Sequence, residues 1–187
     1  AMPLLNRSLC IGCIGLLVMS GCQDRTAQKK PGMMHDVSSA VAVLYPTQGN
    51  DARGIVTFTA VEEGVRVAGT VTGLQPGKHG FHIHEFGDCS AQDGTSAGGH
   101  YAPRGMPHGG RSDSLRHIGD LGNIEANEEG AATFDFTDRV LSLSGTYSIL
   151  GRGVVIHAEA DDVTSQPTGA AGDRVACGTI GVRKAEK

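Results

Sequence analysis

The chain has 187 residues, which allows one ordinary domain with modest additions. Aromatic residues make up 4% of it, Trp is absent and Gly occurs 28 times, a composition that favours short strands joined by turns over a helical bundle. The formal net charge is −4, and residues 1–21 contribute only the positive charge of Arg7, so the remainder is more acidic still. This balance argues against nucleic acid as a partner.

The first residues are typical of an export signal. Arg7 precedes an apolar run, Leu9 to Met19, that is too short to span a bilayer, and small residues then precede Cys22. The arrangement predicts a lipoprotein-type signal in residues 1–21 with lipid attached to Cys22. The alternative is an ordinary secretory signal in which this cysteine is incidental. In either case the protein is expected outside the cytoplasm, in the periplasm or cell envelope, and the lipid is its only predicted attachment to a membrane.

A short tether and one domain are expected to follow. Residues 22–37 are polar and contain a Lys-Lys-Pro-Gly sequence, which predicts a flexible segment. The domain is expected over residues 38–183, with residues 184–187 as a C-terminal tail. Within the domain the only cysteines are Cys89 and Cys177. Two cysteines in an exported domain most often pair, with free thiols as the alternative.

Alternating apolar and polar residues predict a series of short strands. Turn-forming residues separate them at intervals that are typical of an all-β sandwich or barrel. The strands are expected at residues 39–45, 54–60, 65–71, 79–89, 121–126, 131–136, 151–157 and 175–182. Two irregular segments, residues 88–117 and 158–173, interrupt the pattern. A structureless loop as long as the first needs some cause of order inside a domain.

Seven side chains of the kind that bind metals lie in or beside these strands and loops. His82 and His84 are two apart on one predicted strand, so their imidazoles point the same way. Imidazole is the common ligand of copper and zinc, and zinc also accepts carboxylate. Each histidine taken singly is more often incidental, and it is the combined spacing that predicts metal sites. The seven residues are His82, His84, His100, His108, His117, Asp120 and His157.

At this point a family resemblance becomes specific. Seven motifs occur in one order along the domain: GFHIHEFGD, TSAGGHYAP, HGG, RHIGDLGN, LSLSG, GRGVVIHAEADD and GDRVACGTIG. With these motifs, nearly all of the domain resembles the copper/zinc superoxide dismutase family. The resemblance implies an all-β fold, an eight-stranded Greek-key β-barrel related to immunoglobulin-like sandwiches, with long metal-binding and active-site loops.

The resemblance also implies roles for individual residues. It implies copper bound by His82, His84, His100 and His157, and zinc bound by His100, His108, His117 and Asp120. His100 would thus bridge the two metals. Asp161 matches a carboxylate that joins a copper-ligand histidine to a zinc-ligand histidine. Arg174 matches the arginine beside copper, and Cys89 and Cys177 match the intrachain disulfide.

The function implied is the conversion of superoxide to O2 and hydrogen peroxide, with one copper and one zinc per chain. Superoxide is the expected substrate, and His100 and Arg174 are the expected catalytic residues. A homodimer is compatible with the resemblance, which does not settle the assembly. One rival reading is an exported lipoprotein that buffers or delivers copper and zinc without turnover. Another is an adhesion module whose histidines only decorate its loops.

The chain departs from animal members of the family in one loop. Residues 161–174 form a shorter segment, and Pro167 stands where those members carry a lysine that guides the substrate. The arginines of the zinc-side loop, Arg104, Arg111 and Arg116, are a candidate substitute. We interpret them in preference as solvated surface charges.

Overall fold

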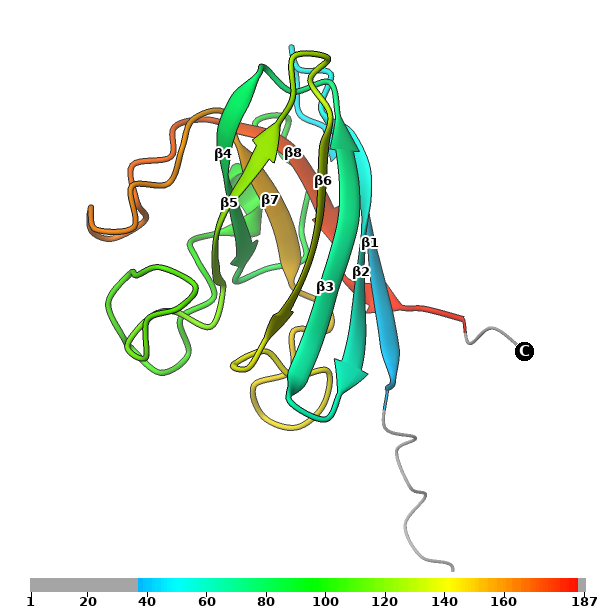
Figure 1. Ribbon diagram of the computed structural model, residues 1–187, viewed down its shortest axis with the longest axis vertical. Coiled ribbons are helices and arrows are strands. Elements are labelled where there is room, and N and C mark those ends of the chain that lie inside the picture. The colour runs from blue at the N-terminus through cyan, green and yellow to red at the C-terminus, as the bar shows by residue number, and fades with distance from the viewer. Residues whose placement is uncertain (1–36, 185–187) are drawn as a thin grey trace, which may run out of the picture. The chain divides into compact units, whose positions relative to one another are not determined.

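A computed structural model describes residues 37–184, and their regular structure is almost entirely β (Figure 1). The strands are β1 (Ser39–Pro46), β2 (Arg53–Val61), β3 (Gly64–Thr72), β4 (Gly77–His84), β5 (Asp120–Ala126), β6 (Ala132–Asp138), β7 (Gly153–His157), β8 (Arg174–Thr179) and β9 (Gly181–Val182). A single 3-10 turn, Thr95–Ala97, is the helical element of this part of the chain. The predicted signal, the lipid site at Cys22 and nearly all of the tether lie outside the described residues. Within residues 37–184 no helix has the length and apolar composition needed to cross a membrane.

The strands form a nearly closed antiparallel barrel. Their hydrogen-bonded order is β5-β4-β7-β8-β1-β2-β3-β6, and the short β9 adds to β1. The pairs β4–β7, β8–β1 and β3–β6 join strands that are not consecutive, which is the Greek-key pattern. The end strands β5 and β6 approach each other without a backbone ladder among the described residues. The predicted fold class is therefore confirmed.

The core follows from the alternation of residues along each strand. In β1, Ala40, Ala42 and Leu44 are buried, whereas Val43 and Tyr45 point outward. The same alternation places the inward side chains of β2 and β3 in one continuous apolar core. Because this pattern is strictly two-fold, a shift of one residue would expose the core, and the register is fixed.

The fourth strand differs from the prediction, since it ends at His84. Beyond that point the backbone leaves the sheet and pairs with the following loop: Glu85 N–H donates to Gly99 O at 2.9 Å and Phe86 N–H to Ala97 O at 2.9 Å. β4 is also buried on both faces over most of its length. Its histidine face therefore lies under the loops and not in solvent.

Two long loops lie beside β4 and β5, on the side of the barrel away from β1 and β2 (Figure 1). They contact each other directly, because the Gln166 side chain accepts a hydrogen bond from His108 N–H at 2.9 Å and donates one to His108 O at 2.9 Å. On the opposite flank of the first loop, Cys89 forms a disulfide with Cys177 of β8. The loops are thus fastened to the barrel and to each other.

The interpretation of all three zinc-side arginines as solvated surface charges is wrong for Arg116. This side chain is buried and not solvated, at 4% exposure, and its Nη2 contacts the carboxylate of Asp138 at 2.6 Å. Its Nη1 donates to the carbonyls of His117 and Asp120 at 3.0 and 2.9 Å. A buried cation must be paired in this way, so Arg116 fixes the base of the loop and is not a steering charge. Arg104 and Arg111 are exposed.

Candidate metal centre

Four histidines from three parts of the chain meet in the first cluster. β4 contributes His82 and His84, and β7, which pairs with β4, ends in His157. An isolated β-bridge between His84 and His100 holds the loop residue His100 against β4. All four are buried, and their candidate ligand atoms lie within 4.8 Å of one another.

Three histidines and one carboxylate form the second cluster. Asp120 begins β5, and its Oδ1 lies 2.8 Å from His100 Nδ1, 3.0 Å from His108 Nδ1 and 3.1 Å from His117 Nδ1. All four residues are buried, and their candidate ligand atoms also lie within 4.8 Å of one another. His100 belongs to both clusters, which places them side by side. The structure thus brings together all seven residues that the sequence suggested as ligands.

Two nitrogen atoms in these clusters are buried without a hydrogen-bond partner among the described residues. They are His82 Nδ1 and His100 Nε2. Buried polar atoms normally find partners, because leaving one unsatisfied is costly. Two such atoms within groups of imidazoles and one carboxylate fit metal ions with nitrogen and oxygen ligands. The donor sets therefore suit copper or zinc in the first cluster and zinc in the second.

The environment keeps three imidazoles of the first cluster, those of His84, His100 and His157, in the neutral form that binds metals. Burial lowers the pKa of His100 to about 4, although Asp120 opposes the shift. Burial and the neighbouring His82 lower the pKa of His157 to about 3. Burial and His100 lower the pKa of His84 as well. These side chains are consequently neutral at pH 7, and a metal need not displace protons from them.

In the second cluster the carboxylate and the imidazoles shift one another. Burial lowers the pKa of His108, but Asp161 and Asp120 outweigh it and leave this pKa raised. Burial raises the pKa of Asp120, but its contact with His100 and the charges of His108 and His117 leave it well below its usual range. Asp120 is therefore an anion at neutral pH, which suits a dication.

The carboxylate of Asp161 contacts one histidine of each cluster. Its Oδ2 lies 2.8 Å from His82 Nε2, and its Oδ1 lies 2.9 Å from His108 Nε2. These contacts leave the other ring nitrogen, Nδ1, of each histidine facing its own cluster. The backbone of Gly169 lies against the carboxylate of Asp161, so closely that an added Cβ would be 2.1 Å from Asp161 Oδ1. Its φ of 71° also favours glycine at this position.

Arg174 begins β8 next to the first cluster. Its Nη1 donates to Gly94 O at 2.6 Å and its Nη2 to Gly98 O at 2.6 Å. Gly98 O also lies 2.9 Å from His84 Nδ1, so Arg174 and His84 contact the same carbonyl oxygen. The half-buried guanidinium acts on the histidines as a nearby positive charge, and it contributes to the lowered pKa values of His84 and His157.

Two residues that position the centre, Asn123 and Gln166, are not marked by any pattern in the sequence. Asn123 donates to Asp161 O at 2.8 Å and accepts from Asp161 N–H at 2.8 Å, which locks the backbone that carries this carboxylate. The Gln166 side chain accepts a hydrogen bond from His108 N–H and donates one to His108 O. Both are amides, which the sequence does not mark as metal ligands, and only the tertiary contacts show their role.

The fold and these clusters define a class of β-barrel protein with two adjacent groups of candidate metal ligands that share a histidine. The family model for copper/zinc superoxide dismutase (SODC) matches residues 52–180. The chain is 44% identical over 156 residues to a superoxide dismutase [Cu-Zn] of Onchocerca volvulus, a match that covers 78% of this chain and 96% of that protein. It therefore belongs to the copper/zinc superoxide dismutase family, as an oxidoreductase with copper and zinc as its cofactors.

Two further relatives extend the comparison. An extracellular superoxide dismutase [Cu-Zn] of Caenorhabditis elegans is 50% identical over 134 residues, which are 68% of this chain and 60% of that protein. The chain thus spans less than two thirds of the length of this relative. A crystal structure of the clock protein EA4 superposes with a TM-score of 0.74 at 45% identity, covering 81% of this chain and 98% of that one.

Proposed function

We propose that the chain dismutes superoxide at a copper held by the first cluster, His82, His84, His100 and His157. Zinc is assigned to the second cluster, His100, His108, His117 and Asp120. The observation that carries this assignment is the position of His100, the one residue in both groups. Copper held there would supply the one-electron chemistry by which one superoxide is oxidised to O2 and a second is reduced, with two protons, to hydrogen peroxide, whereas zinc would have no redox role.

The chain's own residues supply the proton and hold the substrate. His100 Nδ1 faces the carboxylate of Asp120, so its Nε2 is the atom free to take a proton between the two half-reactions and to return it. Asp161 keeps His82 and His108 oriented while this happens. Arg174 offers a cation, fixed by two carbonyls, to the small anion. A protein that only buffered or delivered copper and zinc would not need a cation at this position.

Replacing Arg174 by Gln is expected to lower kcat/KM for superoxide about tenfold, since a single charge near the reacting centre steers an anion by at least this factor. Copper and zinc contents should stay unchanged because Arg174 is not a ligand. Superoxide consumption per bound copper, followed by pulse radiolysis at several ionic strengths, measures the effect. Arg139→Gln is the matched control, because that arginine is exposed and pairs with Glu63. Equal rates in the two variants would refute the steering role.

Export and lipid attachment form a second part of the proposal. A disulfide persists in oxidising compartments outside the cytoplasm, and the Caenorhabditis elegans relative is named as extracellular. We expect residues 1–21 to be removed as a signal, Cys22 to carry lipid, and residues 22–37 to act as a tether in front of the domain at 38–183.

Mass spectrometry of the protein from a membrane fraction is expected to find a lipidated N-terminal Cys22. The variant Cys22→Ser should be recovered in soluble form with unchanged activity per copper. Recovery of the unsubstituted protein with an unmodified Cys22 would contradict the anchor and leave export untouched.

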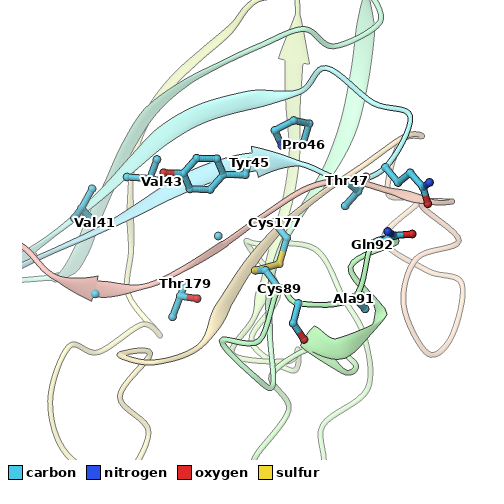
Figure 2. A pocket seen from close by; sticks show the side chains of 14 residues that line it. Val41, Val43, Tyr45, Pro46, Thr47, Cys89, Ala91, Gln92, Cys177 and Thr179 are labelled. Carbon is cyan, nitrogen blue, oxygen red and sulfur yellow. A yellow bond between two sulfur atoms is a disulfide. The ribbon is translucent and has the colours of Figure 1, made fainter.

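We further propose that the domain forms a homodimer through the face shown in Figure 2. A groove of about 670 Å³ runs there between β1 and the disulfide, and none of its lining residues is charged. Val43 and Tyr45 stand on β1 above it, 43% and 67% exposed. Depletion of charge with exposed apolar and aromatic side chains is typical of the centre of a homodimer interface.

Analytical ultracentrifugation is expected to show a dimer for the unsubstituted domain and a monomer for Val43→Asp, which would bury a charge in the contact. The substitution Val61→Asp is the control, because Val61 is exposed to a similar degree, 40%, and does not line the groove. A monomeric unsubstituted domain, or a dimer that survives Val43→Asp, would rule out this face.

A further inference from the structure

A second pocket, of about 340 Å³, lies against the metal centre, and no step of the proposed reaction uses it. His100 contributes to its lining, together with Glu85, Tyr101, Pro103, Tyr147 and Arg152. Its volume is at the lower end of the range of small-molecule sites in proteins. Arg174, the residue assigned to hold superoxide, is not part of its lining.

The pocket is rich in aromatic surface, although the chain as a whole has little. The chain contains three tyrosines, and two of them line this pocket. Tyr101 is buried, with the guanidinium of Arg152 stacked 4.3 Å from its ring centroid. Tyr147 is 38% exposed, and the guanidinium of Arg104 lies 4.8 Å from its ring centroid. Rings and guanidinium planes of this kind are surfaces on which a flat ligand stacks.

The guanidinium of Arg152 in the pocket lining forms no ion pair with a carboxylate in the described part of the chain. The same holds for Arg104 among residues 37–184. Arg152 Nη1 donates to the carbonyl oxygen of Glu85 at 2.6 Å, while its Nε is buried without a partner in the described part of the chain. The carboxylate of Glu85 is the one acid of the lining, and this residue is exposed at the rim.

We propose that this pocket binds a small aromatic carboxylate. The ring packs against Tyr147 and Pro103, and the carboxylate faces the guanidinium of Arg152, which is the side chain suited to planar anions. An occupant would lie beside His100, the residue that both clusters of candidate ligands share. A ligand of this size is expected to bind with a Kd on the order of 1 mM.

Isothermal titration calorimetry of the metal-loaded protein with benzoate tests the proposal, alongside tyrosine fluorescence, which is readable because Trp is absent. Acetate has the charge without the ring, and benzamide has the ring without the charge. Benzoate is expected to bind with saturation and at least about tenfold more tightly than either, because each lacks one of the two interactions. Equal binding of acetate or of benzamide, or no saturation by benzoate, would overturn the proposal.

Variants locate the site. Tyr147→Ala is expected to weaken benzoate at least about fivefold and Tyr147→Phe to restore it, since stacking needs the ring and not the hydroxyl. Glu85→Gln should tighten binding by removing the acid of the rim. Tyr45→Ala is the matched control, because that tyrosine is exposed and lies outside the pocket. Benzoate binding that survives Tyr147→Ala but disappears in Arg174→Gln would assign the ligand to the superoxide site and refute the proposal.

Discussion

Replacing His100 by Ala is expected to lower the dismutase activity per chain on the order of a hundredfold or more, the scale of losing a positioned acid-base group. The imidazole is the single side chain common to both clusters, so its loss removes one ligand from each. It also removes Nε2, the atom assigned to hold the proton between half-reactions. Activity by pulse radiolysis and copper and zinc by elemental analysis, on the same preparation, measure the effect.

His117→Ala is the informative contrast, because His117 belongs to the second cluster alone. This variant is expected to lose zinc but to keep copper and to retain activity within about tenfold, because the copper ligands and the acid-base group are untouched. If His100→Ala were as active as His117→Ala with both metals bound, the shared role of His100 would be wrong.

Removing the disulfide is expected to cost the largest amount of stability of any change considered. The double variant Cys89→Ala, Cys177→Ala opens a connection between residues 88 positions apart. Loop-closure entropy for such a span is about 4–5 kcal/mol, and measured losses are typically 2–5 kcal/mol. For a domain of this size the corresponding drop in Tm is on the order of 10 °C. Calorimetry of the metal-loaded protein measures it.

The same variant is expected to lose part of its activity. The segment that follows Cys89 carries the carbonyls of Gly94 and Gly98, which hold the guanidinium of Arg174. Without the disulfide this segment is freer to move, and the arginine loses its fixed supports. Reductant should lower the Tm of the unsubstituted protein and leave the double variant unchanged. Equal Tm values for the two proteins would contradict the structural role of the bond.

The strands could be predicted because one face of most of them is buried. In β2, Val56 and Phe58 point into the core and Thr57 lies between them on the outer face, so the alternation is visible in the sequence. The end of β4 could not be predicted. Residues 85 and 86 keep the extended pattern, but their backbone groups bond to the following loop. Which partner a backbone group chooses depends on tertiary structure and not on local pattern.

The metal ligands could be proposed from the sequence because their chemistry is specific to a few residue types. Their supports could not, because these depend on which distant segments meet. Arg116 resembles an ordinary surface arginine until β6 brings Asp138 beside it. Asn123 resembles an ordinary strand residue until the second loop places Asp161 against it.

The most direct test of two adjacent metals with a shared histidine is the metal content and activity of one preparation. We expect one copper and one zinc per chain, and activity that disappears when copper is removed and returns in proportion to copper restored. Zinc added alone to metal-free protein should restore no activity, because zinc does not change its oxidation state. Dismutation that persists without copper would contradict the assignment of the reaction to the first cluster.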